Sequence, residues 1–416
     1  MQHAVFNIIG VNINPKNRHR SLQKKGNNLK NRSGKKNKDP ISILEPTLGT
    51  WRTSPTCKWA FHNVREIVPT ADIKNNPQAI WELEQQAPPF DTASLKSLIE
   101  NTSTDAVVII HNNKILFESY HNGMKSDDQH ILFSVSKSIL GLIAGCLIDN
   151  NIIKDTDLIT NYLPELNGTA YDDASIRDAL DMRVGVYFDE DYTAQNGPII
   201  DYRYAANWNP TPESKIDTNL KSFFASLKQR DGSHGGSLKY VSPNTDLLAW
   251  LFERASGKRY ADLVSNYLWK PLGSEQSAYI TVDRIGGMRA AGGICTTARD
   301  LGRLGQLIAQ NGIKDGQQII PALWIEDLYK GENRTAWDNG SFKDFFRSKA
   351  RHYRSNWYIC QEAGQLLHGF GIHGQYLFVD QEKKLSIAWF SSEEEPLNSE
   401  TSQRILNMVN EIRAIL

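Results

Sequence analysis

A serine and a lysine stand three positions apart in the segment FSVSKSILG, where they are Ser134 and Lys137. Residues i and i+3 share one face of a helix, so the hydroxyl and the amine can meet there. A serine hydroxyl attacks a carbonyl carbon once a base removes its proton, and a lysine becomes such a base when burial lowers its pKa. The apolar residues after Lys137 predict that burial. A helix-capping serine followed by a solvated lysine fits the same four residues and is the alternative.

The same spacing occurs twice more, at Ser21/Lys24 and Ser33/Lys36. Both pairs lie within residues 1–40, which hold ten of the 47 lysines and arginines but only one of the 47 acidic residues. This segment is poor in apolar residues, so burial cannot offset the entropy cost of ordering it. We predict a disordered basic tail, in which nothing desolvates a lysine, and we interpret these two pairs as coincidences. Binding to nucleic acid or to another acidic surface is the alternative for the tail.

A tyrosine and another serine, Tyr240 and Ser242, precede an apolar helical pattern in LKYVSPNTDLLAWLFERASGK (238–258). A phenol beside a serine–lysine pair can relay a proton to a leaving group, which turnover requires. The alternative is an ordinary core or surface tyrosine.

Glycines interrupt a strand-like pattern in HGFGIHGQYLFVD (368–380), at Gly369, Gly371 and Gly374. Glycine weakens a strand and usually marks a bulge or a close approach of the backbone to a ligand. The segment therefore predicts either a substrate-binding strand or a bend in a sheet.

The elements that position these residues follow from hydrophobic periodicity. Two β-rich runs flank a polar turn in AVVIIHNNKILFESYH (106–121), which predicts a hairpin. Apolar residues recur at helical spacing from Ser134 to about Asn150 and predict a buried amphipathic helix. The pattern is mostly helical over about 150–280, and strands with a closing helix return from about 365. We predict an α/β (α+β) fold: an antiparallel sheet formed from both chain ends and flanked by helices, with an inserted, mostly helical domain.

The composition restricts the class of protein. The chain has 416 residues, 40% of them hydrophobic, which is enough for one folded domain over residues 41–416. Since the tail is basic and the whole chain has a formal net charge of zero, the rest carries a net charge of −9. Four widely spaced cysteines predict reduced, buried thiols rather than a disulfide framework or a zinc site. With no long apolar run and no signal-peptide pattern, we expect a cytoplasmic protein without a membrane span.

Taken in order, the Ser-x-x-Lys pair, the Tyr-x-Ser about a hundred residues later and the glycine-bearing strand resemble the β-lactamase-like, penicillin-recognising serine hydrolases. This superfamily includes class C β-lactamases, DD-peptidases and esterases. The chain is most similar to its 6-aminohexanoate-dimer hydrolase branch, through the further segments DALDMRVGVYFDEDY, YLWKPLG, AYITVDR and RAAGGICTTARDLGRLGQL. The resemblance covers about residues 45–416. No Gly-x-Ser-x-Gly motif occurs, which argues against an α/β-hydrolase.

The resemblance implies catalytic roles for the matching residues. Ser134 would be the acylating nucleophile, Lys137 its base and Tyr240 the proton relay, and whether Lys137 or Tyr240 takes the first proton stays open. The backbone N–H groups of Ser134 and Ile372 would form the oxyanion hole, where such a donor is typically worth about 3 kcal/mol.

The resemblance also implies a set of substrate-binding residues. Gly369-Phe370-Gly371 would occupy the place of the family's Lys-Thr-Gly, and Tyr192 would contact the substrate amide. Ser242 stands where many members have asparagine, and Gly369 replaces the cation that would bind the carboxylate of a β-lactam or a D-Ala-D-Ala stem. His368 or His373 could substitute only in part, because histidine is mostly neutral at pH 7. The implied substrate-binding residues are Tyr192, Ser242, Gly369, Gly371 and His373.

These expectations define a cytoplasmic serine hydrolase that acts on small esters or amides through an acyl-enzyme. The alternatives are a DD-peptidase or β-lactamase and, from another class, a catalytically silent binding protein of the same fold. We expect no cofactor, since the ten histidines show no metal-binding spacing, and likewise no metal ion. The expected partner is a small-molecule substrate; no membrane is expected, nucleic acid concerns only the basic tail, and the oligomeric state, including a homodimer, stays open.

Overall fold

The computed structural model describes residues 46–330, 334–346, 351–361 and 364–416. All of them belong to one compact unit, Leu44–Leu416. The basic segment 1–40 and its two Ser-x-x-Lys pairs lie outside the described residues.

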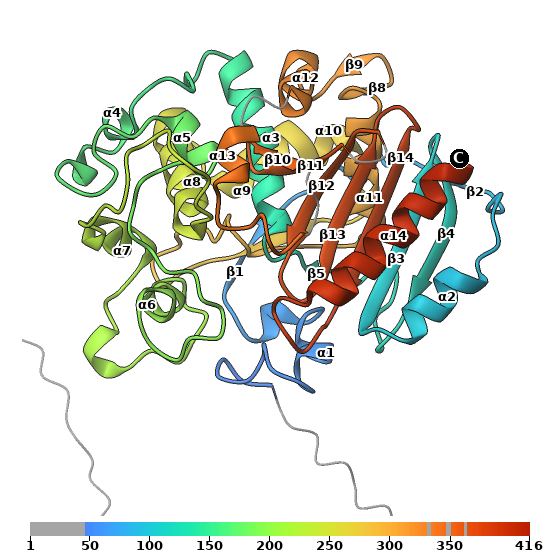
Figure 1. Cartoon of the computed structure of the whole chain (residues 1–416), viewed down its shortest axis with the longest axis horizontal. Coiled ribbons are helices and arrows are strands. Elements are labelled where there is room, and N and C mark those ends of the chain that lie inside the picture. Colours follow the sequence, from blue (N-terminus) through green and yellow to red (C-terminus); the bar gives the residue numbers. More distant parts are fainter. Residues whose placement is uncertain (1–45, 331–333, 347–350, 362–363) are drawn as a thin grey trace, which may run out of the picture. The chain divides into compact units, whose positions relative to one another are not determined.

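An eight-stranded sheet joins the two ends of this unit (Figure 1). Strands β14 and β3 pair side by side in antiparallel register although they come from opposite ends of the chain, and this pairing confirms the predicted sheet. The hairpin expected at 106–121 is β3 and β4, and its turn residues Asn112 and Asn113 have φ angles of 49° and 65°, the left-handed region that asparagine tolerates. Only the edge pair β2/β4 is parallel. In sheet order the strands are β10 (Arg351–Arg354), β11 (Trp357–Cys360), β12 (Leu366–Gly371), β13 (Gln375–Asp380), β14 (Leu385–Ser391), β3 (Thr104–His111), β4 (Lys114–Tyr120) and β2 (Glu84–Gln85).

Alternating side chains of the central strands separate the two faces of this sheet. Val107 and Ile109 of β3 belong to an apolar cluster with helices α2 (Ala93–Glu100) and α14 (Ser399–Ile415). Val108 and Ile110 belong to the larger cluster on the other face, which includes α11 (Ala298–Ala309). Figure 1 shows α2 and α14 lying over one face of the sheet and α11 over the other. The sheet is therefore covered on both faces, as a strand of consecutive apolar residues requires.

A second sheet of four short strands was not anticipated from the sequence. Its order is β1 (Thr70–Ile73), β6 (Ala278–Thr281), β7 (Ile294–Thr296) and β5 (His130–Ile131), all paired antiparallel. Strands of two to four residues show no measurable alternation, so only their partners identify them. The sheet matters for the site because β5 ends three residues before Ser134, and β7 is preceded by Ala291 and Gly292.

Helix α3 (Val135–Asp149) follows Ser134, as predicted, but it is not amphipathic. Every residue from Val135 to Leu147 is buried, so the helix is the centre of the domain rather than a one-faced surface helix. Gly141 and Gly145 permit this, because a Cβ atom there would lie 2.0 Å from the Ser355 carbonyl oxygen and 2.4 Å from the Trp324 ring, respectively.

Residues 150–280 follow β5 in the chain and run into β6, and the named elements among them before β6 are all helices. All four cysteines are buried. Within the described ranges, no helix combines the length and the apolar character that crossing a membrane would take. The remaining helices are α1 (Cys57–Ala60), α4 (Ile159–Tyr162), α5 (Ile176–Leu180), α6 (Pro198–Ala205), α7 (Leu220–Ser226), α8 (Ser242–Ser256), α9 (Tyr260–Val264), α10 (Lys270–Leu272), α12 (Ala322–Tyr329) and α13 (Arg334–Asp338), and β8 (Ile313–Lys314) pairs with β9 (Gln317–Gln318).

Candidate active site

Ser134 stands at the N-terminus of α3, yet its side chain does not cap the helix. Its Oγ instead lies 2.7 Å from the Lys137 amine one turn along. The preceding residue, Phe133, has a φ angle of 42°, which is rare for a bulky side chain and costs on the order of 1–3 kcal/mol. Ring contacts with Phe61 and Trp208 hold Phe133 in place. The alternative of a helix cap with a solvated lysine is therefore excluded by the geometry.

Lys137 is buried, with 1% of its surface exposed. Its Nζ also lies 2.7 Å from the carbonyl oxygen of Ala291. Burial lowers the pKa of this amine to about 7, and Arg289 lowers it further, while the negative charges of Glu190 and Asp246 oppose the shift. A lysine with this pKa is about half neutral at pH 7 and mostly neutral above it, so it can accept the proton of Ser134.

The Ala291 carbonyl is held in position by the helix that follows Tyr240. Asp246 of α8 accepts a 2.6 Å hydrogen bond from the Ala291 N–H, and it also pairs with the buried Arg289. Arg289 in turn donates to the Tyr202 hydroxyl. The segment RAAGGICTT was noted in the sequence only for its resemblance to the family; its role in fixing the lysine depends on contacts that sequence spacing does not reveal.

Tyr240 lies on the extended segment that leads into α8, with 5% of its surface exposed. The Lys137 amine lies 5.0 Å from the centroid of its ring. Burial and then the nearby Glu190 raise the pKa of this phenol well above its usual range, and side-chain hydrogen bonds with Ser134 and Tyr358 reduce the rise. The phenol therefore stays protonated, which suits a residue that donates a proton rather than one that starts as a base.

Strand β12 ends at Gly371, directly before Ile372, whose backbone N–H is the expected second oxyanion donor beside that of Ser134. A Cβ atom on Gly371 would lie 2.5 Å from the Leu132 carbonyl oxygen and 3.1 Å from the Ser134 nitrogen, so only glycine allows this approach. The next residue, Ile372, lines the same cavity as Ser134. Among the described residues, no acceptor is recorded for the N–H of Ser134 or of Ile372. Both N–H groups are therefore available for an oxyanion.

Gly369 stands where the resemblance placed the family's cationic residue, but in this structure it packs against helix α3. A Cβ atom there would lie 2.9 Å from Ser138 Oγ and 3.1 Å from Val135 Cγ1, both on α3. A side chain at this position would therefore require the side chains of Ser138 and Val135 to shift. The strand contacts α3 at both glycines, and it bears no cation toward Ser134.

The two histidines of this strand region lie apart from each other. His373 is buried, its Nδ1 is 2.7 Å from the Glu393 carbonyl oxygen, and burial lowers its pKa to about 4. His368 lies on the other side of the strand, where its Nε2 is 2.7 Å from an Arg351 nitrogen, and burial followed by the Arg351 charge holds its pKa far below the usual value. Both rings are neutral at pH 7, so neither provides a positive charge.

Glu190 connects two of the predicted residues, Tyr192 and Ser242. It was not predicted from the sequence. Its carboxylate accepts hydrogen bonds from the Tyr192 hydroxyl at 2.8 Å, from the Ser242 N–H at 2.5 Å and from the Ser242 hydroxyl. Ser242 is thereby committed to Glu190, while the ring of Tyr192 lines the cavity. The motif GVYFDEDY contains three acidic residues, and nothing in it distinguishes the one that points inward.

A cavity of about 380 Å³ opens over Ser134. Its lining includes Ile372 and two arginines that the sequence analysis did not single out, Arg52 and Arg203. The same arginines, together with Tyr192 and Ile372, also line a larger recess of about 1220 Å³, so the two spaces share a wall. The larger recess therefore adjoins the Ser134 cavity along a wall that carries two arginines.

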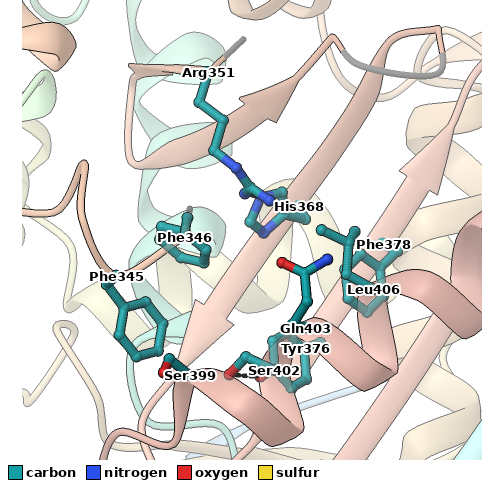
Figure 2. Close-up of a pocket in the computed structure, with 10 residues that line it drawn as sticks. All are labelled: Phe345, Phe346, Arg351, His368, Tyr376, Phe378, Ser399, Ser402, Gln403 and Leu406. Atoms are coloured by element: carbon teal, nitrogen blue, oxygen red, sulfur yellow. Dashed lines mark hydrogen bonds between the residues drawn. The ribbon is translucent and has the colours of Figure 1, made fainter. Parts of the chain in front are cut away.

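Another cavity, of about 310 Å³, lies between the main sheet and α14 (Figure 2). Phe345, Phe346 and Phe378 form its apolar walls, and Arg351 and His368 point into it. Ser134 and Lys137 do not line it, so it is separate from the nucleophile. The described residues contain no group of three or more side chains able to hold a metal ion.

Comparisons with known proteins agree with this geometry. The chain matches the Beta-lactamase family over residues 95–408. It is 34% identical over 357 residues to the 6-aminohexanoate-dimer hydrolase of Paenarthrobacter ureafaciens, covering 85% of this chain and 89% of that protein. A solved structure from Bacillus anthracis that carries the name 6-aminohexanoate-dimer hydrolase superposes with a TM-score of 0.79 at 26% identity, covering 90% of this chain and 98% of the other. The D-stereospecific amidohydrolase of a Streptomyces species shares the fold at 17% identity, with a TM-score of 0.58 and coverage of 76% and 98%.

Proposed function

The chain belongs to the beta-lactamase family, and from this premise we propose that it is a serine hydrolase that cleaves small amides or esters through an acyl-enzyme. The observation that carries the proposal is the contact between Ser134 Oγ and the buried amine of Lys137, whose pKa is lowered to about 7. An unused serine–lysine pair would not need a desolvated lysine, which costs folding free energy.

In the proposed acylation step, Ser134 Oγ attacks the substrate carbonyl and its proton passes to Lys137. The negative charge that develops on the carbonyl oxygen is met by the N–H groups of Ser134 and Ile372. When the tetrahedral intermediate collapses, the bond to the leaving group breaks, and the leaving amine or alcohol takes a proton through Tyr240. The opposite pKa shifts of the two side chains support Lys137, rather than Tyr240, as the first base.

Deacylation reverses these roles with water as the nucleophile. Water attacks the acyl carbonyl, loses a proton to the Lys137–Tyr240 pair, and the C–O bond to Ser134 breaks as Oγ is reprotonated. The products are a carboxylic acid and the free enzyme. No group beyond the chain and water enters this sequence.

We favour linear amides of the aminohexanoate type and short-chain esters over β-lactams as substrates. The name of the 34% identical relative supports the first class. Gly369 argues against β-lactams as preferred substrates, because the strand places no cation beside the scissile bond, where a β-lactam carboxylate would lie. We also propose a cytoplasmic location, where four buried thiols stay reduced.

The test combines covalent labelling with turnover. A fluorophosphonate probe should add one label to the chain by intact mass, at Ser134, and a Ser134→Ala chain should take up none. Short-chain p-nitrophenyl esters should turn over much faster than any cephalosporin, and aminohexanoate oligomers slowly but detectably. Absence of labelling would point to a silent binding protein, and faster hydrolysis of a cephalosporin than of p-nitrophenyl acetate would favour a β-lactamase.

A further inference from the structure

Two arginines on the wall of the catalytic cavity have no role in the chemistry described above. Arg52 precedes α1, and Arg203 lies in α6. Both line the cavity of Ser134, and both extend into the larger recess beside it. They come from neither α3 nor β12, so they form a different wall from the one that contains Gly369.

Arg52 is a largely buried cation. Its guanidinium carbon lies 5.3 Å from the centroid of the Trp51 ring and 5.8 Å from that of Trp208, and it donates to the side-chain oxygen of Asn209. Its Nε is buried without an acceptor among the described residues. Burial lowers the pKa of Arg52 to about 9, and repulsion from Arg203 and Arg289 adds to the shift.

Arg203 is held beside the cavity by the backbone rather than by an acid. Its Nη2 donates a 3.0 Å hydrogen bond to the Tyr192 carbonyl oxygen. Burial lowers its pKa and the charge of Arg289 lowers it further, while Tyr192, Glu190 and Asp191 oppose the shift. Within the described part of the chain, no carboxylate forms an ion pair with either Arg52 or Arg203.

Two of the acids near the cavity are already occupied, and a third, Glu394, is exposed on the wall of the larger recess. Asp246 pairs with Arg289, and Glu190 accepts hydrogen bonds from Tyr192 and Ser242. The two remaining arginines therefore repel each other in a partly desolvated space. A buried charge is costly unless it is paired, so an anionic group entering the cavity would relieve this repulsion.

We propose that Arg52 and Arg203 bind a carboxylate of the substrate, which makes the enzyme selective for esters and amides with an anionic group near the scissile carbonyl. This inference rests on the proposed function, because the selectivity is that of the Ser134 site. Guanidinium groups match carboxylates in geometry and form charge-assisted hydrogen bonds. One such bond changes a rate by about ten- to a hundredfold when it is made in the transition state.

A purely structural role for the two arginines leads to a different expectation. Arg52 packs between two tryptophans, and Arg203 supports the loop of Tyr192. If they only shaped the cavity, their replacement would slow anionic, neutral and cationic substrates alike. The ratio between substrates, rather than the rate for any one of them, separates the two roles.

The experiment uses the full chain and two matched ester series. The first places the charge in the acyl part: mono-p-nitrophenyl glutarate and adipate, neutral p-nitrophenyl butyrate and cationic p-nitrophenyl 6-aminohexanoate. The second places a carboxylate or a neutral amide on the phenol of a butyrate ester. The variants are Arg52→Gln and Arg203→Gln. The control is Arg254→Gln, which removes the same charge from an exposed ion pair with Glu165 at the far end of α8.

In at least one series, kcat/KM for the anionic ester should exceed that for the neutral ester about tenfold or more, and the preference should shrink with added salt. Arg52→Gln and Arg203→Gln should each reduce this ratio about tenfold, and Arg254→Gln should leave it unchanged. Equal rates for anionic and neutral esters in both series, with Ser134 still labelled, would overturn the carboxylate site but not the hydrolase. Failure to hydrolyse any ester or to label Ser134 would instead overturn the proposed function.

Discussion

At the scale of single residues, the chemistry depends on one desolvated amine. Lys137 is surrounded by buried groups, and its Nζ contacts only Ser134 Oγ and the Ala291 carbonyl among the hydrogen-bond partners in the described residues. Burial accounts for most of the fall in its pKa to about 7. The fold thus gives up stability at neutral pH, where the same lysine would be charged in the unfolded chain, in return for a base.

The ester hydrolysis rate should therefore follow the protonation of Lys137. As the pH falls below about 7, the amine becomes protonated and can no longer accept the serine proton, so kcat/KM should fall about tenfold per pH unit. Above pH 7 the rate should level off, because the raised pKa of Tyr240 keeps the phenol protonated. The profile can be measured with a p-nitrophenyl ester at the isosbestic wavelength of the product. A flat profile down to pH 5 would contradict a lysine base.

Ser134, Lys137 and Tyr240 should act as one unit. Ser134→Ala, Lys137→Ala and Tyr240→Phe should each remove most turnover, and pairs of these changes should cost little more than the single changes. Steady-state kinetics on the three single and three double variants, compared with the unmodified chain, would measure these losses. Circular dichroism would check that each variant folds. Additive losses, or an active Ser134→Ala protein, would rule out the proposed mechanism.

At the scale of elements, the site depends on how closely β12 approaches α3. The missing side chain of Gly371 leaves room for the Leu132 carbonyl and the Ser134 nitrogen, and the missing side chain of Gly369 leaves room for Ser138 and Val135. In the proposed mechanism, the end of one strand and the N-terminus of one helix therefore define the oxyanion hole together. Neither element forms the hole alone.

Gly371→Ala should separate the strand from the helix and weaken the oxyanion hole. A Cβ atom 2.5 Å from a backbone oxygen cannot be accommodated by a side-chain movement, so kcat for a p-nitrophenyl ester should fall at least about a hundredfold. The matched control is Gly232→Ala, where a Cβ atom would meet nothing within 4 Å. Thermal unfolding of both variants separates a local effect from global loss of structure. Unchanged kcat in Gly371→Ala would place the oxyanion donors elsewhere.

At the scale of the whole molecule, the catalytic residues come from distant parts of the chain. β14 and β3 close the main sheet across the two ends, and the hydrogen bond that fixes Lys137 links residues 154 positions apart. Both core clusters and the cavity residues named above belong to this one unit. Folding and activity should therefore be properties of the Leu44–Leu416 unit.

Deletion of residues 1–40 should leave both properties intact. Because this segment is basic and poor in apolar residues, the free energy of unfolding should change by less than about 0.5 kcal/mol, as for changes away from packed groups. Ester hydrolysis should be equal in the full and shortened chains. Denaturant unfolding and kcat/KM measure the two quantities. A large loss of either would show that the basic segment contacts the folded unit.

The sequence by itself determined the elements and the kinds of chemical group. Local periodicity was sufficient for the hairpin at 106–121, the helix after Ser134 and the sheet formed from both chain ends, because each signal lies within a dozen residues or so. The order of Ser134, Lys137 and Tyr240, together with the glycine-bearing strand, indicated the type of reaction through the resemblance to a known family. The short strands β1, β5, β6 and β7 left no local signal, and their partners alone define them.

Only the tertiary structure shows what surrounds the Ser134–Lys137 pair. Three pairs share the same spacing; of these, the structure describes only Ser134 and Lys137, where Lys137 is buried among residues far apart in the sequence. The positions of Glu190, Arg52 and Arg203 around the cavity also depend on long-range packing. The physical reason is that a pKa, an oxyanion hole and a charged pocket depend on distance and on the exclusion of water, which local sequence spacing does not encode.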